Sequence, residues 1–274
     1  MGKLLDKLDS GATTVWLDHL GYAAALLSRG VVPWLSTAEF ISLLARAQGL
    51  LKSDVVAFPL APACAAWIEA NPGLSAAMGS KSRVGFPLKT LLSDEALRAH
   101  LVEVANGLRA SMAGAALALV LPSPRAWLGT AYAQGHGGAT VDVEDDDADS
   151  ASVYVADFLR GFANSVDALS MQEAADFTPQ SADQVALYQA VINVARNYRW
   201  DVGLHLQGTV DAAVAGAIDF TIAPGAAHGK RQGVVVPAEY WSGKGSAPAA
   251  PFRYAAIPAD AKPETVLDKL AALR

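Results

Sequence analysis

The chain has 274 residues, of which 52% are apolar and 18% charged, and its formal net charge at pH 7 is -6. This length and composition are typical of one large α/β domain, or two small ones, with a substantial buried core. The acidic balance and the scattering of Lys and Arg along the chain exclude a general nucleic-acid surface, because such a surface needs clustered cations.

Cysteine content and apolar runs bear on the cell compartment. Cys64 is the only cysteine, so an internal disulfide is excluded. Residues 1–10 mix charged and apolar groups, unlike a signal peptide, and no later segment approaches the ~20 apolar residues of a membrane-spanning helix. We expect a cytoplasmic protein with a small-molecule substrate and no nucleic-acid or membrane partner, and self-association into a homo-oligomer is left open.

The predicted elements begin with a β-branched strand at residues 13–17, which ends at Asp18 and His19. Ser36 and Glu39 form a capping box ahead of an amphipathic helix that should stop near residue 49. A second strand follows at residues 54–59. The pattern therefore starts as strand, helix, strand.

The segment from residue 62 to 87 is rich in Pro and Gly and predicts a loop with one short helix. Ser93 is a candidate cap for a helix that runs to about residue 114, with acidic residues in its first turn. Residues 116–121 are entirely apolar, as in a strand buried on both faces. Residues 133–152, with glycines and an acidic run, predict a surface loop excursion.

The middle of the chain predicts one strand–helix–strand unit, preceded by a helix over residues 153–163. Short apolar strands lie within residues 166–173 and 200–208, and both end in polar groups. Between them Ser181 and Gln184 form a capping box before apolar residues at helical spacing. The two strands should lie parallel, so their polar ends should emerge on one rim.

The last quarter predicts three more strands, at residues 218–222, 233–236 and 252–257. Thr209 is expected to cap a short helix before the first of them, and Pro263 to start a closing helix after the last. Eight strands with mostly helical crossovers indicate an α/β fold, a single (β/α)8 TIM barrel over residues 1–274. It should be irregular after strands six and seven, where the connections are short. An open doubly wound sheet is the alternative.

In a barrel, the residues that follow the carboxyl ends of the strands converge on one mouth. This rule gathers a set of candidates for catalysis and substrate binding. The predicted catalytic residues are His205, Glu173 and Arg125, and the predicted substrate-binding residues are Asp18, His19, Trp127, Gln172, Gln207, Glu239 and Tyr240. We expect Glu173 and His205 to share one cleft.

Each of these candidates also has a purely structural interpretation. His205 suits an acid, base, electrophile or metal ligand, or else a histidine hydrogen-bonded in the core. Glu173 suits proton transfer, metal binding or a structural ion pair. Arg125 suits a bidentate clamp on a substrate carboxylate, or a tie to its own loop. Asp18 and His19 are adjacent, so at most one is expected to enter the mouth.

Residues 201–208, Asp-Val-Gly-Leu-His-Leu-Gln-Gly, resemble the fifth-strand His-x-Cys-Gly segment of the superfamily of uroporphyrinogen decarboxylase and cobalamin-independent methionine synthase. Residues 169–175, Leu-Ser-Met-Gln-Glu-Ala-Ala, are similar to the preceding strand of that group, where a Gln-x-Asp-Glu-Pro-like motif occurs. The resemblance implies a TIM barrel whose interior binds a carboxylated or aromatic small molecule.

Two departures limit what the resemblance implies. Gln207 stands where the zinc-dependent methyltransferases of the superfamily have their first cysteine, and no cysteine follows it, so a thiol-rich zinc site is excluded. Residues 58–61 read Phe-Pro-Leu-Ala where the decarboxylase branch has Phe-Ser-Asp-Ile. The usual porphyrinogen decarboxylation is therefore not expected.

Three functions remain open on the sequence. The first is a small-molecule lyase, in the form of a decarboxylase, with Arg125 on a carboxylate and His205 or Glu173 transferring a proton. The second is a metal-assisted one-carbon (methyl) transferase in which His205 and Glu173 hold a divalent metal; no other cofactor is predicted. The third is a non-catalytic barrel that binds a ligand or a partner.

Overall fold

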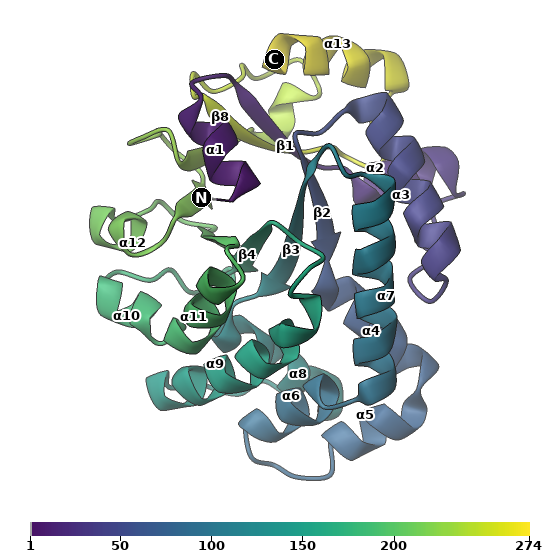
Figure 1. Ribbon diagram of the computed structural model, residues 1–274, viewed down its shortest axis with the longest axis vertical. Helices are drawn as coiled ribbons and strands as arrows, with labels where there is room; N and C mark the ends of the chain where they lie inside the picture. The colour runs from purple at the N-terminus through teal and green to yellow at the C-terminus, as the bar shows by residue number, and fades with distance from the viewer. Residues whose placement is uncertain (1) are drawn as a thin grey trace.

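The computed structural model describes residues 2–274 and contains a closed barrel of eight parallel strands in chain order (Figure 1). The barrel closes because β8 pairs with β1 from Thr14 opposite Phe252 to Asp18 opposite Ala256. This pairing confirms the (β/α)8 fold and excludes the open sheet. The strands are β1 Thr14–Asp18, β2 Val55–Pro59, β3 Ala116–Pro122, β4 Ala168–Gln172, β5 Asp201–His205, β6 Phe220–Ala223, β7 Gln232–Val235 and β8 Phe252–Ala256.

Helices surround the barrel between most pairs of strands. They are α1 Lys3–Asp9, α2 Leu20–Leu27, α3 Thr37–Leu51, α4 Leu60–Ala70, α5 Pro72–Met78, α6 Gly85–Leu92, α7 Glu95–Ser111, α8 Pro124–Gly135, α9 Asp145–Leu159, α10 Ala182–Ala186, α11 Gln189–Asn197, α12 Ala212–Ala217 and α13 Pro263–Leu273. The described chain has no helix between β6 and β7, and only the short 3-10 helices η1 (Arg160–Phe162) and η2 (Ala238–Tyr240) supplement the rest. The predicted irregularity after strands six and seven is confirmed.

Alternate residues of the strands fill the barrel interior. Trp16, Phe220, Phe252 and Tyr254 are its largest side chains, and the ring centroids of Trp16 and Phe220 are 6.1 Å apart. Gly203 faces Phe220 across this layer, where an added Cβ would lie 2.3 Å from that ring. A side chain at this position would overpack the core.

Helix α1 lies at the amino ends of the strands. The Asp201 carboxylate, at the start of β5, accepts hydrogen bonds from the backbone amides of Gly2 (3.0 Å), Leu4 (3.1 Å) and Leu5 (3.0 Å). These are donors that a helix leaves free at its N-terminus. Leu4, Leu5 and Leu8 pack against the interior layer. The amino end of the barrel is therefore covered, and the carboxyl end carries the cavity described below.

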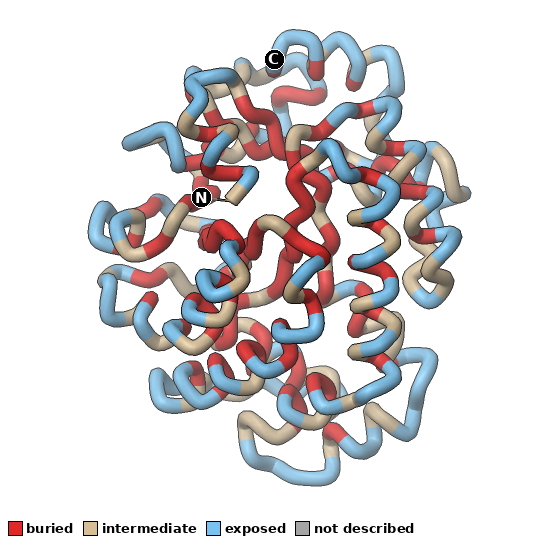
Figure 2. Tube along the Cα trace, in the orientation of Figure 1, coloured by how far each residue is buried: buried red, intermediate tan, exposed pale blue. Residues whose placement is uncertain are grey.

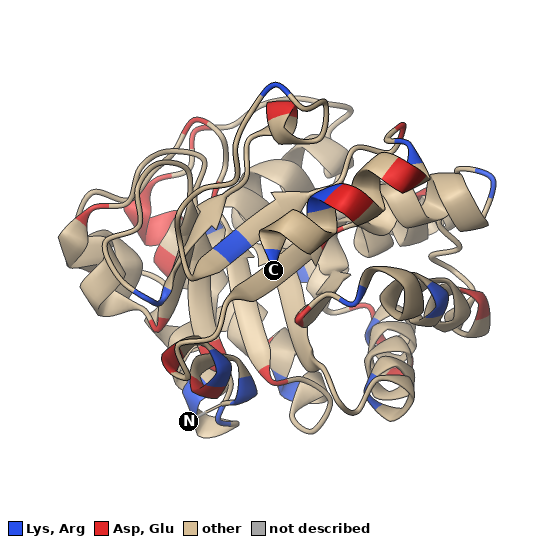
Figure 3. Cartoon of the chain, turned by 90° about the horizontal axis from the view of Figure 1, so that it is seen from above, with Lys and Arg blue, Asp and Glu red and all other residues tan. Residues whose placement is uncertain are grey.

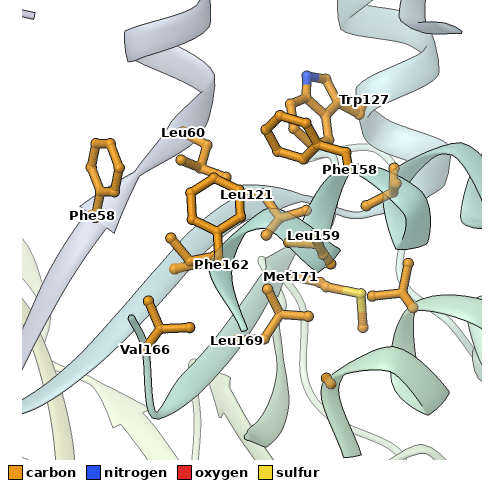
Figure 4. Close-up of a cluster of buried hydrophobic side chains, with 14 of the residues drawn as sticks. Phe58, Leu60, Leu121, Trp127, Phe158, Leu159, Phe162, Val166, Leu169 and Met171 are labelled. Carbon is orange, nitrogen blue, oxygen red and sulfur yellow. The ribbon is translucent and has the colours of Figure 1, made fainter. Parts of the chain in front are cut away.

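The other face of each strand packs against the helices. Figure 4 shows part of this layer, in which Leu121 from β3 lies close to Phe158 and Phe162 of the helical shell, and Phe58 from β2 lies beside Leu60 of α4. In Figure 2 the buried residues follow the strands and the inward faces of the helices. Acidic and basic residues both occur on the outer helices and loops (Figure 3). Within residues 2–274 no helix combines the length and the apolar character needed to span a bilayer.

Two predicted irregular segments are more helical than expected. Residues 62–87 lie largely in α4, α5 and the start of α6, because Pro72 occupies a first turn, where proline is tolerated. The surface excursion predicted at 133–152 is irregular only between α8 and α9. Its acidic run forms the first turn of α9, where the helix dipole stabilises carboxylates, and the following alanines are buried.

Hydrogen bonding corrects two predicted helix caps and one detail of a third. Asp94, not Ser93, caps α7, with its carboxylate accepting from the Leu97 amide at 2.7 Å. Asp211, not Thr209, caps α12 in the same manner. Ser181 does cap α10, but the Gln184 side chain accepts from the Gln180 amide, one residue earlier than a full capping box requires. The helix expected after it is divided into α10 and α11.

Candidate functional site

A cavity of about 370 Å³ opens at the carboxyl ends of the strands. It lies directly above the interior layer, since Trp16, Val120 and Tyr254 belong to both. The other apolar lining includes Trp34 from the segment before α3. The polar lining residues are Asp18, His19, Ser170, Gln172, His205 and Tyr254, and neither Lys nor Arg is among the lining residues. A pocket of this size and character suits a compact, mainly apolar ligand with a few polar groups.

His205 is the last residue of β5 and lines this cavity with 8% of its surface exposed. Burial lowers the pKa of the imidazole to about 4, so the ring is neutral at pH 7. The Gln172 amide nitrogen lies 3.4 Å from Nδ1 of His205 and donates to it, which leaves the ring proton on Nε2. Within residues 2–274, the only side-chain hydrogen bond of His205 is the one at Nδ1, so Nε2 has no partner in the described chain. His205 therefore offers the cavity a neutral N–H donor.

Tyr254 belongs to β8, and its side chain extends across the barrel mouth to the His205 ring. The two ring centroids are 4.6 Å apart in an edge-on arrangement. The Tyr254 hydroxyl donates to Oδ2 of Asp18 at 3.2 Å. Burial, and then the Asp18 charge, raise the pKa of this phenol, which stays protonated. Gln172, His205, Tyr254 and Asp18 thus form a continuous row across the mouth.

Sequence reasoning missed Tyr254, although a signal for it exists. Residues 252–256 alternate large aromatic and other residues, and the strand period of two puts Phe252 and Tyr254 on one face. Phe252 is fully buried in the interior layer, so Tyr254 faces the interior one step nearer the mouth. The alternation in this strand was therefore sufficient to find it.

Asp18 and His19 both line the cavity, so the prediction that at most one enters the mouth is wrong. The strand pleat ends at Asp18, and His19 has a ψ angle of 6°, far from the strand value. This turn brings consecutive side chains to the same side. Nδ1 of His19 is 3.1 Å from the Leu17 carbonyl oxygen, and burial lowers the pKa of the ring.

Glu173 does not line the cavity, so the predicted cleft shared with His205 is not formed. Glu173 follows Gln172, and adjacent strand residues face opposite ways; only its backbone N–H reaches β5, donating to the His205 carbonyl at 3.0 Å. Its carboxylate accepts from the Ser123 hydroxyl at 2.6 Å and the Tyr188 hydroxyl at 2.7 Å. Burial raises the pKa of Glu173, and these hydrogen bonds oppose the rise.

Arg125 is also outside the cavity, which corrects its predicted position on a substrate carboxylate. It lies in the first turn of α8, and its guanidinium hydrogen-bonds the Val143 carbonyl and pairs with Asp145. Its guanidinium carbon lies 4.5 Å from the centre of the Phe177 ring. Arg125 therefore fastens the connection between α8 and α9, as its structural interpretation predicts.

The four remaining predicted substrate-binding residues lie away from the cavity. Trp127 is 1% exposed in α8, with its ring centroid 6.0 Å from that of Phe158. Gln207 is exposed beyond β5, and Glu239 is exposed in η2. Tyr240 is buried, and its hydroxyl donates to the Lys269 carbonyl at 2.6 Å. By these positions the chain has already turned outward from the strand ends.

The described residues also bear on metal binding. Within residues 2–274, no three His, Cys, Asp or Glu side chains gather in a way that could hold a metal ion. His205 and Glu173, the predicted pair of ligands, face opposite sides of the barrel wall. Cys64 is buried, and burial raises the pKa of its thiol to about 12, so it packs as a small apolar side chain.

Comparisons with known proteins add no relative to this picture. No family model, no curated protein and no solved structure matches the chain. The candidate site therefore rests on its own geometry: a cavity at the mouth of a (β/α)8 barrel with a neutral histidine on one wall and a tyrosine–aspartate pair facing it.

Proposed function

We propose that the chain is a small-molecule lyase that breaks a carbon–carbon bond next to the carbonyl group of a compact, uncharged, partly aromatic substrate. One observation carries the proposal: His205 presents a neutral N–H to the mouth cavity, because Gln172 occupies Nδ1 and burial keeps the ring uncharged. Cleaving such a bond leaves negative charge on the carbonyl oxygen. A preorganised donor in a water-poor site stabilises that charge.

The residues of the row across the mouth supply the remaining steps. The carbonyl oxygen accepts from Nε2 of His205, and the bond between the α- and β-carbons breaks, so that its electron pair forms the enolate. The leaving β-carbon fragment carries a hydroxyl group, gives that proton to water and departs as a second, neutral carbonyl compound. The hydroxyl of Tyr254 then gives its proton to the enolate carbon, and Asp18, which already accepts from that hydroxyl, orients it. Water carries the proton released by the leaving fragment to the phenolate. A positioned proton donor typically contributes about 10²- to 10⁴-fold.

The lining favours an uncharged substrate over the carboxylate that a decarboxylase needs. No Lys or Arg lines the cavity, and Asp18 would repel a second carboxylate. Arg125, the expected clamp, pairs with Asp145 instead. Trp16 and Trp34 provide apolar and aromatic surface for a ring. The lyase proposal is therefore kept, and its decarboxylase form is replaced by cleavage of a neutral carbonyl compound.

Hydrogen exchange tests the proposal without knowledge of the natural substrate. An enzyme that stabilises an enolate also catalyses its reversible formation, so the protein should speed deuterium incorporation next to the carbonyl of phenylacetone in D2O, followed by proton NMR. We expect His205→Phe to abolish this acceleration. His228→Gln is the matched control, because His228 is exposed in the loop before β7 and away from the cavity. Exchange no faster than in buffer, or unchanged in His205→Phe, would contradict the proposal.

A ligand-binding barrel without catalysis is the second candidate. The low pKa of His205 favours it, because an imidazole with a pKa of about 4 is a weak base at neutral pH. This candidate predicts that phenylacetone binds and that His205→Phe weakens binding, with no exchange in either protein. The methyl-transferase alternative has less support, since His205 and Glu173 do not share a site. The superfamily resemblance stays a prediction.

A further inference from the structure

We propose that Nε2 of His19 accepts a hydrogen bond from a hydroxyl group of the ligand, so that the site selects hydroxylated carbonyl compounds. This inference rests on the proposed function, because it concerns the same cavity and assumes that His205 holds the carbonyl oxygen. It adds a second polar anchor, the residue that holds the hydroxyl group of such a substrate.

The tautomer of His19 follows from its one hydrogen bond. Nδ1 lies 3.1 Å from the Leu17 carbonyl oxygen, and a carbonyl oxygen only accepts, so Nδ1 carries the proton and donates it. Nε2 of the neutral ring is then a bare acceptor. The two histidines of the cavity are therefore complementary: His205 donates from Nε2 and His19 accepts at Nε2.

This acceptor is buried and has no partner. His19 is 4% exposed, and Nε2 finds no hydrogen-bond donor anywhere in residues 2–274. A buried polar atom without a partner is costly, and proteins rarely retain one without a reason. His19 is among the residues that line the mouth cavity, so a donor carried by a ligand is the partner that the site lacks.

The surroundings indicate which donor fits. Carboxylates and carbonyl groups cannot donate, and the neighbouring carboxylate of Asp18 repels anions. An ammonium group would leave water for a lining that is mostly apolar, where a charge is poorly solvated. A hydroxyl group donates without carrying a charge, and we therefore assign the missing donor to a hydroxyl.

Calorimetric titration with matched ketones tests this assignment. Acetophenone carries only the carbonyl group, the 3- and 4-hydroxyacetophenones add a donor, and the corresponding methoxy compounds add similar bulk without a donor. We expect the better hydroxy isomer to bind the wild-type protein about tenfold more tightly than its methoxy counterpart, because one buried acceptor gains its hydrogen bond. The amino isomers form a further arm.

Variants locate the effect. His19→Phe keeps an aromatic ring but removes the acceptor, and it should eliminate the preference for hydroxy over methoxy compounds while acetophenone still binds. His228→Phe, in the exposed loop before β7, should retain the full preference. The wild-type comparison of hydroxy with methoxy compounds needs no variant, so it decides the question even if His19→Phe folds poorly.

The outcomes separate this inference from the proposed function. Equal affinity for hydroxy and methoxy compounds would overturn the role of His19 while leaving the lyase intact, provided that acetophenone binds and phenylacetone exchanges. A preference that persists in His19→Phe would overturn it too, by pointing to another acceptor. Tighter binding of the amino isomers would reject the hydroxyl assignment. Failure of every ketone to bind would remove both proposals.

Discussion

Two polar clusters lie at the same end of the barrel, and they differ in which hydrogen-bonding atoms remain without a partner. In the mouth cluster, the Tyr254 hydroxyl donates to Asp18 at 3.2 Å, beside His205 and His19. In the sealed cluster, the Tyr188 hydroxyl donates to Glu173 at 2.7 Å, beside Ser123. Each cluster pairs a tyrosine with a carboxylate, yet only the first faces a cavity.

The hydrogen-bond inventories show what this difference means. In the sealed cluster, Ser123 donates to Glu173 and accepts from the Ala126 amide, and both carboxylate oxygens of Glu173 are occupied. In the mouth cluster, Nε2 of His19 and Nε2 of His205 find no partner within residues 2–274. Saturated polar groups stabilise a fold, whereas unsatisfied groups beside a cavity are available to a ligand.

Removing the carboxylate of each cluster should give the largest difference in stability between the two clusters. We expect Glu173→Ala to lower the free energy of unfolding by about 3 kcal/mol, because the buried hydroxyls of Ser123 and Tyr188 lose their acceptor. Asp18→Ala should cost less than about 1 kcal/mol, since Asp18 is exposed. Urea denaturation measures both. Equal losses would mean that the mouth cluster is as structural as the sealed one.

The pH dependence of the free energy of unfolding tests the mouth cluster, because the pKa of His205 differs between the folded and unfolded states. Its pKa is lowered to about 4 in the folded protein from 6.5, so the unfolded chain binds more protons between these values. Stability from this group is complete above pH 6.5 and is lost as the pH falls toward 4. The loss from pH 7 to pH 5 should be about 2 kcal/mol.

Urea denaturation of wild type and His205→Phe at both pH values measures this contribution, because the other titrating groups are common to the two proteins. The wild-type protein should lose more stability than the variant on acidification. If the two proteins lose the same amount, the ring of His205 titrates in the folded state as it does in water, and it is not the neutral donor on which the site depends.

Removing one tyrosine hydroxyl from each cluster should change stability least, and it compares the two clusters with the same substitution. Tyr188→Phe should cost about 1 kcal/mol, because its hydroxyl makes a short, buried, charge-assisted hydrogen bond. Tyr254→Phe should cost about half as much or less, since its acceptor Asp18 is exposed to water. Thermal unfolding resolves the difference, and the reverse order would contradict the distinction between the clusters.

Much of the barrel could be predicted because its signals are local. Apolar runs, several of them β-branched, marked all eight strands, and short connections marked the irregular part after strands six and seven. The rule that strand ends converge at one mouth placed Gln172, His205 and one of Asp18 and His19 together, and the cavity contains all four. The same rule failed for Gln207 and Glu239, where the chain leaves the rim before the residue is reached.

The sequence by itself determined the barrel and the end at which its polar strand termini gather, since apolar runs and their period depend only on neighbouring residues. Only the tertiary structure decided which polar groups the cavity receives. Glu173 is held outside by Ser123, 50 positions earlier, and by Tyr188, while Arg125 is held by Asp145 in another helix. A buried polar side chain takes the position in which hydrogen bonds or an ion pair best offset its loss of water. The partners that make those bonds come near only when the whole ring of strands has closed.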